Sequence, residues 1–443
     1  MMLAFALRWY YVSTTFVYAP LSGDASQYFI YAWNLAHHSV FSLSAPGAHT
    51  IVPDNYRDPG YPLFLAVWMK LLGHTQASYY AVLSSQALLG ALTVGFCTEL
   101  CRHWLSTRWA AAAGLLMAIW PHSIAINGFL LTETLSGFWC SLGMLLWAQA
   151  CNDKRYGFAL ASGLFFGFAA LTNAVLQPFG ILLAALTAWR TPPLRKICLI
   201  LALATAALPT AWAIRNAHLP SVDIHSSSRG RAMQNLVQGS WPAYHPAWRL
   251  SKIGDETAKA NAKMILDAIN REYELLLTAP LAGTGAIGQR LGQHPFAYLG
   301  WYLIEKPYEL WGWDIEIGQG DIYPYPVANS PFQTDRVWIL LAAICDTVNP
   351  LLLLLALACP FLAWCTPTST VSQRISVECR PLMSVIGLVI FVTLVYTTLQ
   401  AEPRYSIPFR SFEIVLAFTS VASLAARWKA YKDAKVDRIT PKS

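Results

Sequence analysis

The sequence is poor in charged residues. Of its 443 residues, only 12% are Asp, Glu, Lys or Arg, whereas 55% are apolar. An ordinary soluble domain carries about 25% charged residues. The composition therefore excludes a protein made of soluble domains, although 443 residues would be long enough for two or three of them. The mean hydropathy of +0.40 agrees, and the composition predicts an integral membrane protein.

The sequence also shows no sign of a disulfide framework in its long polar stretch or of a cleavable signal peptide. The nine cysteines are an odd number, and none falls between Arg215 and Arg336, the one long polar stretch, so no disulfide framework holds that stretch together. The first residues carry no basic segment and no A-x-A site, so we expect no cleavable signal peptide. The net charge of +7 would suit nucleic acid, but the excess lies in short loops between apolar segments, which excludes that partner.

Apolar segments long enough for a membrane helix recur along the chain. The first is interrupted by Arg8, so we expect either a short helix or a true start before Met1. The fifth and sixth segments are short and joined by a tight turn. We predict an all-α polytopic protein with about ten transmembrane helices, over residues 2–21, 79–100, 109–127, 131–150, 156–171, 174–189, 197–214, 347–365, 382–399 and 406–426.

Basic residues alternate between the connections. One set of connections and the C-terminal tail hold 15 of the 31 basic residues, whereas the opposite short connections hold only Arg404. Positive charge favours the cytoplasm, so we expect both termini inside. Three regions follow: an N-terminal transmembrane module at 1–218, an outward periplasmic region at 219–336, and C-terminal helices with a cytoplasmic tail at 337–443.

Polar residues then gather at one depth, at the outer ends of helices or in outer loops. Acids and arginines collected at one interface suggest a reaction centre, although loop ends are polar in every membrane protein and several could be caps or anchors. These residues are Asp24, Arg57, Asp58, Glu133, Asn173, Arg215, Glu402 and Arg404.

The outer loops contain helical patterns of their own. In the first, 22–78, residues 24–38 and 61–73 are too short to span and are typical of helices lying in the interface plane. Asp24 opens the first of them and could be a simple N-cap. In the long loop, 253–278 is amphipathic, and 289–313 is rich in Trp and Tyr, which favours an aromatic belt at the membrane surface over a sugar-stacking platform. We expect the following helix to begin near Asn349.

Several short motifs, in this order, resemble GT-C glycosyltransferases. The resemblance is to the dolichyl-phosphate-mannose–protein mannosyltransferase-like family and its bacterial members, including lipid A aminoarabinose transferases, and it spans nearly the whole chain. Such proteins often carry Thr-Arg-Pro after the fifth helix, where this chain has TNA at 172–174. The matching motifs are Gly23-Asp24 with Tyr28 and Ala32, RDPGYPLFL at 57–65, LTETL at 131–135, SGL at 162–164 with Gly167, IRN at 214–216, His294-Pro295, and EPRY at 402–405.

The resemblance implies a polyprenyl-phosphate sugar as donor and an acceptor hydroxyl or amine on protein, lipid A, O-antigen or another envelope glycan. It also implies a bacterial inner membrane with a periplasmic active site and no metal or other cofactor. A hydroxyl that attacks an anomeric carbon needs a base, for which Asp24 is the candidate. A single displacement would invert the anomeric centre. The leaving phosphate needs arginine, and the candidates are Arg57, Arg215 and Arg404, with Tyr405 as a hydrogen-bond donor.

Other acids have open roles. Glu133 either orients the acceptor or pairs with Arg57. Asp58 pairs with Arg57 or stabilises its turn, and Tyr28 and Glu402 are possible supporting residues. Because Glu402 and Arg404 flank a proline, we expect them to face different directions.

Two other classes of protein compete. A transporter or flippase of polyprenyl-linked lipid would show internal repeats and ionisable groups near the midplane, and neither is found in the sequence. A catalytically silent relative that acts as a binding partner is disfavoured by Asp24, Glu133 and Arg404, although Asn173 leaves it some room. Replacing Asp24 by Asn separates these classes, because only the enzyme loses turnover while still binding its donor.

Overall fold

The computed structural model describes residues 1–219, 224–313, 325–364 and 372–439. Within these ranges the chain is almost entirely helical, and its one sheet pairs β1 (Phe16–Val17) antiparallel with β2 (Val327–Ala328), Phe16 opposite Ala328. The all-α prediction is therefore confirmed. β1 and β2 tie the segment after the first helix to the segment before α17 (Pro331–Thr334).

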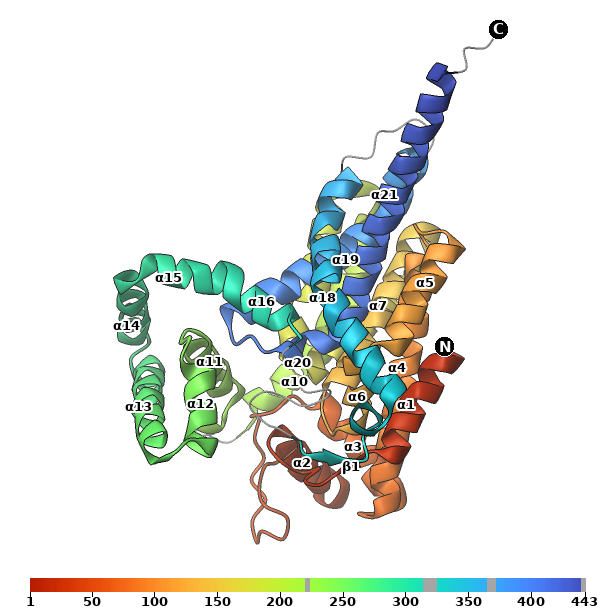
Figure 1. Ribbon diagram of the computed structural model, residues 1–443. Helices are drawn as coiled ribbons and strands as arrows, with labels where there is room; N and C mark the ends of the chain where they lie inside the picture. The colour runs from red at the N-terminus through yellow and green to blue at the C-terminus, as the bar shows by residue number, and fades with distance from the viewer. Residues whose placement is uncertain (220–223, 314–324, 365–371, 440–443) are drawn as a thin grey trace.

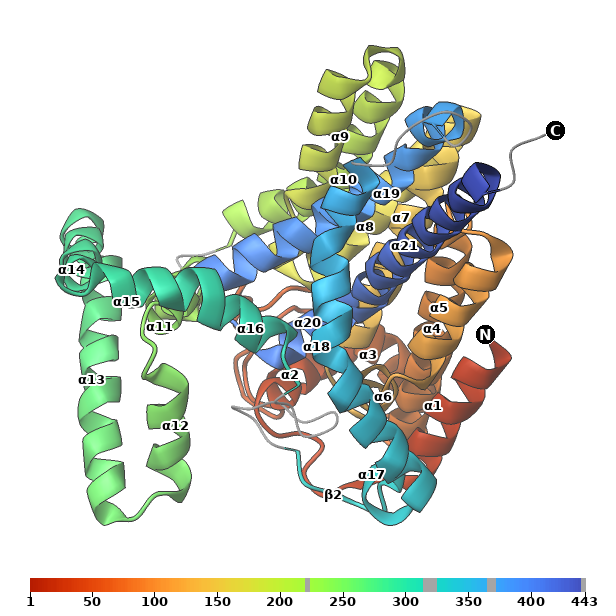
Figure 2. The same ribbon diagram turned by 45° about the horizontal axis from the view of Figure 1, so that its top comes forward.

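A row of long helices forms the N-terminal part of the bundle. Each packs on the next in the order α1, α4, α7, α8, α10, α9 (Figure 2). α7 is central, and most of its side chains are buried, Glu133 at its start among them. The bounds are α1 Met2–Thr14, α4 Gln76–Cys101, α5 Thr107–Ile119, α6 Pro121–Ala125 with the 3-10 turn η1 Ile126–Gly128, α7 Glu133–Asp153, α8 Tyr156–Thr172, η2 Ala174–Leu176, α9 Phe179–Arg190, η3 Pro192–Leu194 and α10 Arg195–Ala217.

The C-terminal helices complete the bundle. α18 (Arg336–Trp364) packs along α21 (Arg410–Ile439), and α19 (Ser372–Thr398) packs on α7. The short α20 (Pro403–Ser406) and η6 (Ile407–Phe409) lead into α21. α18 begins thirteen residues before the expected Asn349, so that prediction was wrong. Asn349 is accommodated within the helix because its amide donates to the Trp311 carbonyl and accepts from buried Arg410.

Among the residues that the structure describes, five helices are long and apolar enough to cross a membrane, and a sixth counts if α5 and the α6–η1 segment, bent by 60°, form one span. Three shorter apolar helices cover Gly60–Leu72, Tyr156–Thr172 and Ala174–Arg190. The chain is thus a multi-pass membrane protein by the composition of its helices. The number ten stays a prediction, and the first expected span, 2–21, is a helix only to Thr14.

At one end of the bundle lie two short helices and a helical arm. α2 (Asp24–His38) and α3 (Gly60–Leu72) match the two helices expected in the first loop and lie at the opposite end from the C-terminal end of α21 (Figure 1). The arm is α11 (Ser228–Gly239), α12 (Tyr244–Ile253), α13 (Glu256–Thr278) and α14 (Pro280–Gln293), preceded by η4 (Ile224–Ser226). α15 (Pro295–Gly300), the π-helical turn η5 (Trp301–Glu305) and α16 (Lys306–Trp311) return to the bundle.

The arm has a small apolar core of its own. Val237 of α11, Tyr244 of α12, and Ile269 and Leu276 of α13 are buried there against one another. The amphipathic helix expected at 253–278 is α13, whose apolar face makes up most of this core. The arm therefore folds as a layer beside the bundle and meets it at a few defined points.

Candidate active site

Asp24 stands at the start of α2 because the chain turns sharply just before it. Gly23 precedes the helix with φ +53°, a conformation that favours glycine. Gly23, and not Asp24, occupies the N-cap position of α2, so the N-cap alternative does not hold. The side chain points instead to two guanidinium groups from other parts of the chain.

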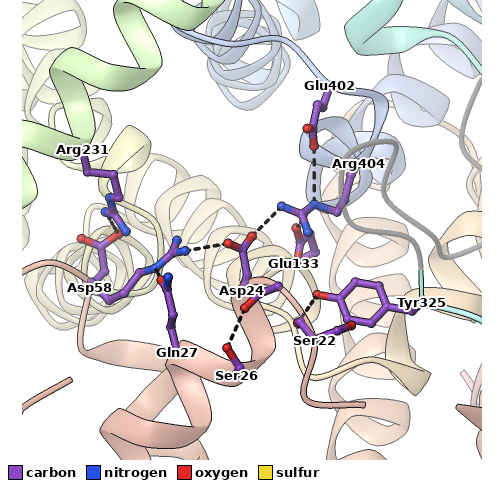
Figure 3. A network of polar contacts seen from close by, with 12 residues as sticks. Ser22, Asp24, Ser26, Gln27, Asp58, Glu133, Arg231, Tyr325, Glu402 and Arg404 are labelled. Atoms are coloured by element: carbon purple, nitrogen blue, oxygen red, sulfur yellow. Dashed lines mark hydrogen bonds and ion pairs between the residues drawn. The ribbon is translucent and has the colours of Figure 1, made fainter. Parts of the chain in front are cut away.

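Asp24 bridges two arginines. Its Oδ1 accepts from Arg57 Nη2 at 2.6 Å and its Oδ2 accepts from Arg404 Nη2 at 2.8 Å, although Arg404 lies 380 positions away (Figure 3). Burial alone would raise the pKa of Asp24, but the two positive charges outweigh it and hold this pKa well below its ordinary value. Asp24 is therefore a carboxylate at any physiological pH in this arrangement.

Arg404 joins further acids to the network. Its Nε lies 3.2 Å from Glu133 Oε1 and 3.8 Å from Glu402 Oε2. Glu133 was considered as a partner of Arg57 but pairs with Arg404, which comes closer to the start of α7. Glu402 and Arg404 were expected to diverge, yet α20 begins between them and brings both side chains to the same network.

Asp58 forms a second ion pair beside the first. Its Oδ2 accepts from Arg231 Nη2 of the arm at 3.0 Å and from the Ala174 amide at 3.3 Å. Asp58 was expected to pair with Arg57 or to stabilise its own turn. It pairs instead with the arm and with the segment after α8. Arg57 turns the other way, donating from Nε to Gln27 at 2.6 Å.

These groups line a cavity of about 720 Å³ between the bundle and the arm. The bundle supplies the ionic network together with the tyrosines Tyr28, Tyr396 and Tyr405. Tyr396 and Tyr405 stack with ring centroids 5.0 Å apart, and Arg57 lies 5.2 Å above Tyr28. The arm supplies polar side chains from α11, α12 and α13, among them Arg231 and Gln238.

Not every expected residue reaches this cavity. Arg215 donates to the carbonyl of Asp54 at 2.5 Å and to that of Phe41 at 3.2 Å, and it is absent from the described cavity lining. Its position braces the first outer loop, and its role as a phosphate clamp stays a prediction. Asn173 does line the cavity and donates to the Tyr396 hydroxyl at 2.8 Å.

Sequence reasoning missed several members of the site, among them Gln27, Arg231 and Tyr325. Gln27 was detectable, because it lies one helical turn after Asp24 and so shares its face. Arg231 gave no signal, since it lies in a long polar loop without a motif. Tyr325 donates to the Ser22 carbonyl at 3.2 Å and closes the network from the segment before β2. Among the described residues, no group of three His, Cys, Asp or Glu side chains is placed to hold a metal ion.

No protein-family model and no curated protein matches the sequence. Solved structures do match. The oligosaccharyltransferase of Archaeoglobus fulgidus, in the apo form, aligns with a TM-score of 0.51 and 13% identity over 100% of this chain and 51% of that one. The same archaeal enzyme, AglB, in complex with an inhibitory peptide and a dolichol-phosphate, aligns with a TM-score of 0.52 and 12% identity over 100% of this chain and 52% of its own.

A third similarity is weaker. ArnT from Cupriavidus metallidurans, bound to undecaprenyl phosphate, aligns with a TM-score of 0.39 and 13% identity over 96% of this chain and 76% of that one, which is too low to support an argument. The chain spans about half the length of the archaeal structures it matches. The two archaeal similarities alone confirm the resemblance, and only at the level of the fold: the chain shares the fold of that oligosaccharyltransferase.

Proposed function

We propose that this chain is a membrane glycosyltransferase that moves a sugar from a polyprenyl-phosphate donor to an acceptor hydroxyl or amine. The observation that carries the proposal is Asp24, held between Arg57 and Arg404 at the wall of a large cavity. The fold supports it, because the archaeal structure of the same fold is described with dolichol-phosphate bound. The site would face the periplasm of a bacterial inner membrane, with both termini cytoplasmic.

The reaction needs one base and one anion clamp. The acceptor oxygen or nitrogen attacks the anomeric carbon, the bond from that carbon to the phosphate oxygen breaks, and the acceptor proton passes to Asp24. The phosphate leaves with both bonding electrons and is stabilised by arginine, so no general acid is needed. Attack opposite the leaving group inverts the anomeric centre.

Donor binding would itself activate Asp24. A phosphate that enters the cavity competes with Asp24 for the guanidiniums of Arg57 and Arg404, because both acids offer the same kind of acceptor. Each hydrogen bond that Asp24 gives up removes a cause of its low pKa and makes it a stronger base. Glu133 keeps Arg404 in place through this exchange, and the Tyr405 hydroxyl is available to the phosphate at the same wall.

The test is turnover of a panel of labelled polyprenyl-phosphate sugars in liposomes, with a membrane extract as the source of acceptor. Wild type should consume one donor, whereas Asp24→Asn and Arg404→Ala should not. Asp24→Asn should still bind the donor. Asp267→Asn, an exposed acid of α13 outside the cavity lining, is the matched control and should keep full activity.

Two results would count against the proposal. If no donor is consumed but one crosses the bilayer equally fast in wild type and Asp24→Asn, the protein is a flippase. If a chelator such as EDTA abolishes turnover and a divalent cation restores it, the metal-free chemistry is wrong even though the transferase assignment stands.

A further inference from the structure

The arm turns a row of amide side chains toward the cavity. Gln234, Asn235 and Gln238 of α11 follow Arg231 at spacings of three, four and seven residues, which places all four on one face of the helix. All four line the cavity, as does Asn270 of α13. The opposite face of α11 packs into the core of the arm through Met233 and Leu236, and Val237 is buried at its edge. The amide face therefore looks across the cavity at Asp24 and its arginines.

The side chains of these amides form no hydrogen bonds within the described part of the protein. Within the described part of the chain, Gln234, Asn235, Gln238 and Asn270 make no side-chain hydrogen bond. Each amide offers two donors and a carbonyl acceptor. Polar groups in a half-closed site need partners, and an amide can serve hydroxyl groups as both donor and acceptor.

The arginines that line the same cavity, in contrast, already form ion pairs with carboxylates. Each arginine that lines it in the described residues has a carboxylate partner: Arg57 and Arg404 share Asp24, and Arg231 holds Asp58. An anionic ligand against α11 would have to break the Arg231–Asp58 pair. A neutral ligand rich in hydroxyl groups would meet only the unoccupied amides, and Trp248 of α12 adds an aromatic ring to the same wall.

We propose that the amide face of α11, with Asn270 and Trp248, is a subsite for a neutral saccharide of the acceptor. The inference rests on the proposed function for the acceptor's role, because the donor phosphate belongs on the arginine side of the cavity and the donor's lipid tail must leave toward the membrane. The acceptor then approaches from the arm, with its reacting hydroxyl directed at Asp24. The subsite selects an uncharged glycan over a phosphorylated one.

Direct binding tests the subsite without requiring turnover. Saturation-transfer NMR on the purified protein would compare methyl glycosides of neutral hexoses and their disaccharides with the matching sugar 1-phosphates. We expect at least one neutral glycoside to bind more tightly than its phosphate, and Asn235→Ala and Gln238→Ala each to weaken it about two- to tenfold. Asn261→Ala, an exposed asparagine of α13 outside the lining, is matched to Asn270→Ala and should change nothing.

A kinetic experiment separates binding of the acceptor from the chemistry of the donor. In Asn235→Ala, transfer to the extract acceptor should fall with a raised acceptor KM, and it should fall more than the slow hydrolysis by water that is measured with the donor alone. Loss of hydrolysis in the variant would place the amides on the donor, and preferential binding of the phosphates would also overturn the subsite. If neutral glycosides bind at these amides but no donor is consumed, the subsite stands and the proposed function fails.

Discussion

The joint between the arm and the bundle leaves no room for a side chain at Gly239. A Cβ at this last residue of α11 would lie 1.5 Å from the Leu399 carbonyl oxygen and 2.4 Å from its carbon. Both are backbone atoms that cannot swing aside. Lys306 is buried at the same point, and its ammonium nitrogen donates to the carbonyls of Gly239 and Leu399 at 2.8 Å each. We therefore predict that Gly239→Ala separates the arm from the bundle.

The size of the effect follows from the geometry. Because Cβ contacts under 3.0 Å are essentially never found, the backbones must part by about 1.5 Å. A shift of that size takes at least one of the two Lys306 hydrogen bonds beyond its usual range. A hydrogen bond contributes about 0.5–1.5 kcal/mol, so losing one shifts the docking equilibrium of the arm about two- to tenfold.

The assay is a distance distribution between spin labels at Asn261→Cys on the arm and Gln76→Cys at the start of α4, two exposed positions. Gly239→Ala should lengthen and broaden it and lower acceptor transfer. Gly285→Ala on α14, where a Cβ meets nothing within 4 Å, is the matched control and should leave both unchanged. An unaltered distribution in Gly239→Ala would refute the reasoning.

Three other perturbations have defined outcomes. Arg215→Ala should leave the donor KM unchanged, because Arg215 bonds the loop carbonyls of Phe41 and Asp54; a tenfold rise would show that it does clamp the phosphate. Burial lowers the pKa of Lys306 to about 7, so the docked arm binds fewer protons than the open one and docking should tighten as pH rises from about 7 toward 10. A label distance independent of pH would contradict this, and Lys306→Met should abolish the dependence. Glu413→Gln should destabilise the protein by about 3–5 kcal/mol, because it leaves buried Arg410 without its carboxylate; an unchanged thermal midpoint would argue otherwise.

The sequence indicated much of the bundle side of the site. Asp24, Glu133 and Arg404 could be placed at one depth because each begins or precedes an apolar segment. The orientation in the membrane, inferred from the alternating basic loops, stays a prediction. Their mutual contacts could not be predicted, since an ion pair across 380 positions depends on how helices pack. The Glu402–Arg404 contact was missed because the proline between them starts a short helix instead of splaying the two side chains.

Other errors came from treating polar residues as helix boundaries. Asn349 suggested that α18 begins late, but it is bonded to Trp311 and Arg410 inside the bundle. A polar residue that finds a buried partner does not interrupt a helix, and no local pattern discloses that partner. Arg231 was overlooked for a similar reason, because its partner Asp58 lies 173 positions earlier in the chain.

The separate core of the arm has a consequence for how such a protein can diversify. Because Val237, Tyr244, Ile269 and Leu276 stabilise the arm from within, its cavity-facing positions can change without disturbing the packing of the bundle. If the proposed function holds, substitutions at Gln234 or Asn235 change which molecule is glycosylated while Asp24 and Arg404 keep the same chemistry. A chimaera could carry the arm of another chain of this fold on this bundle. It should then recognise the acceptor of the chain that supplied the arm and use the donor of this chain.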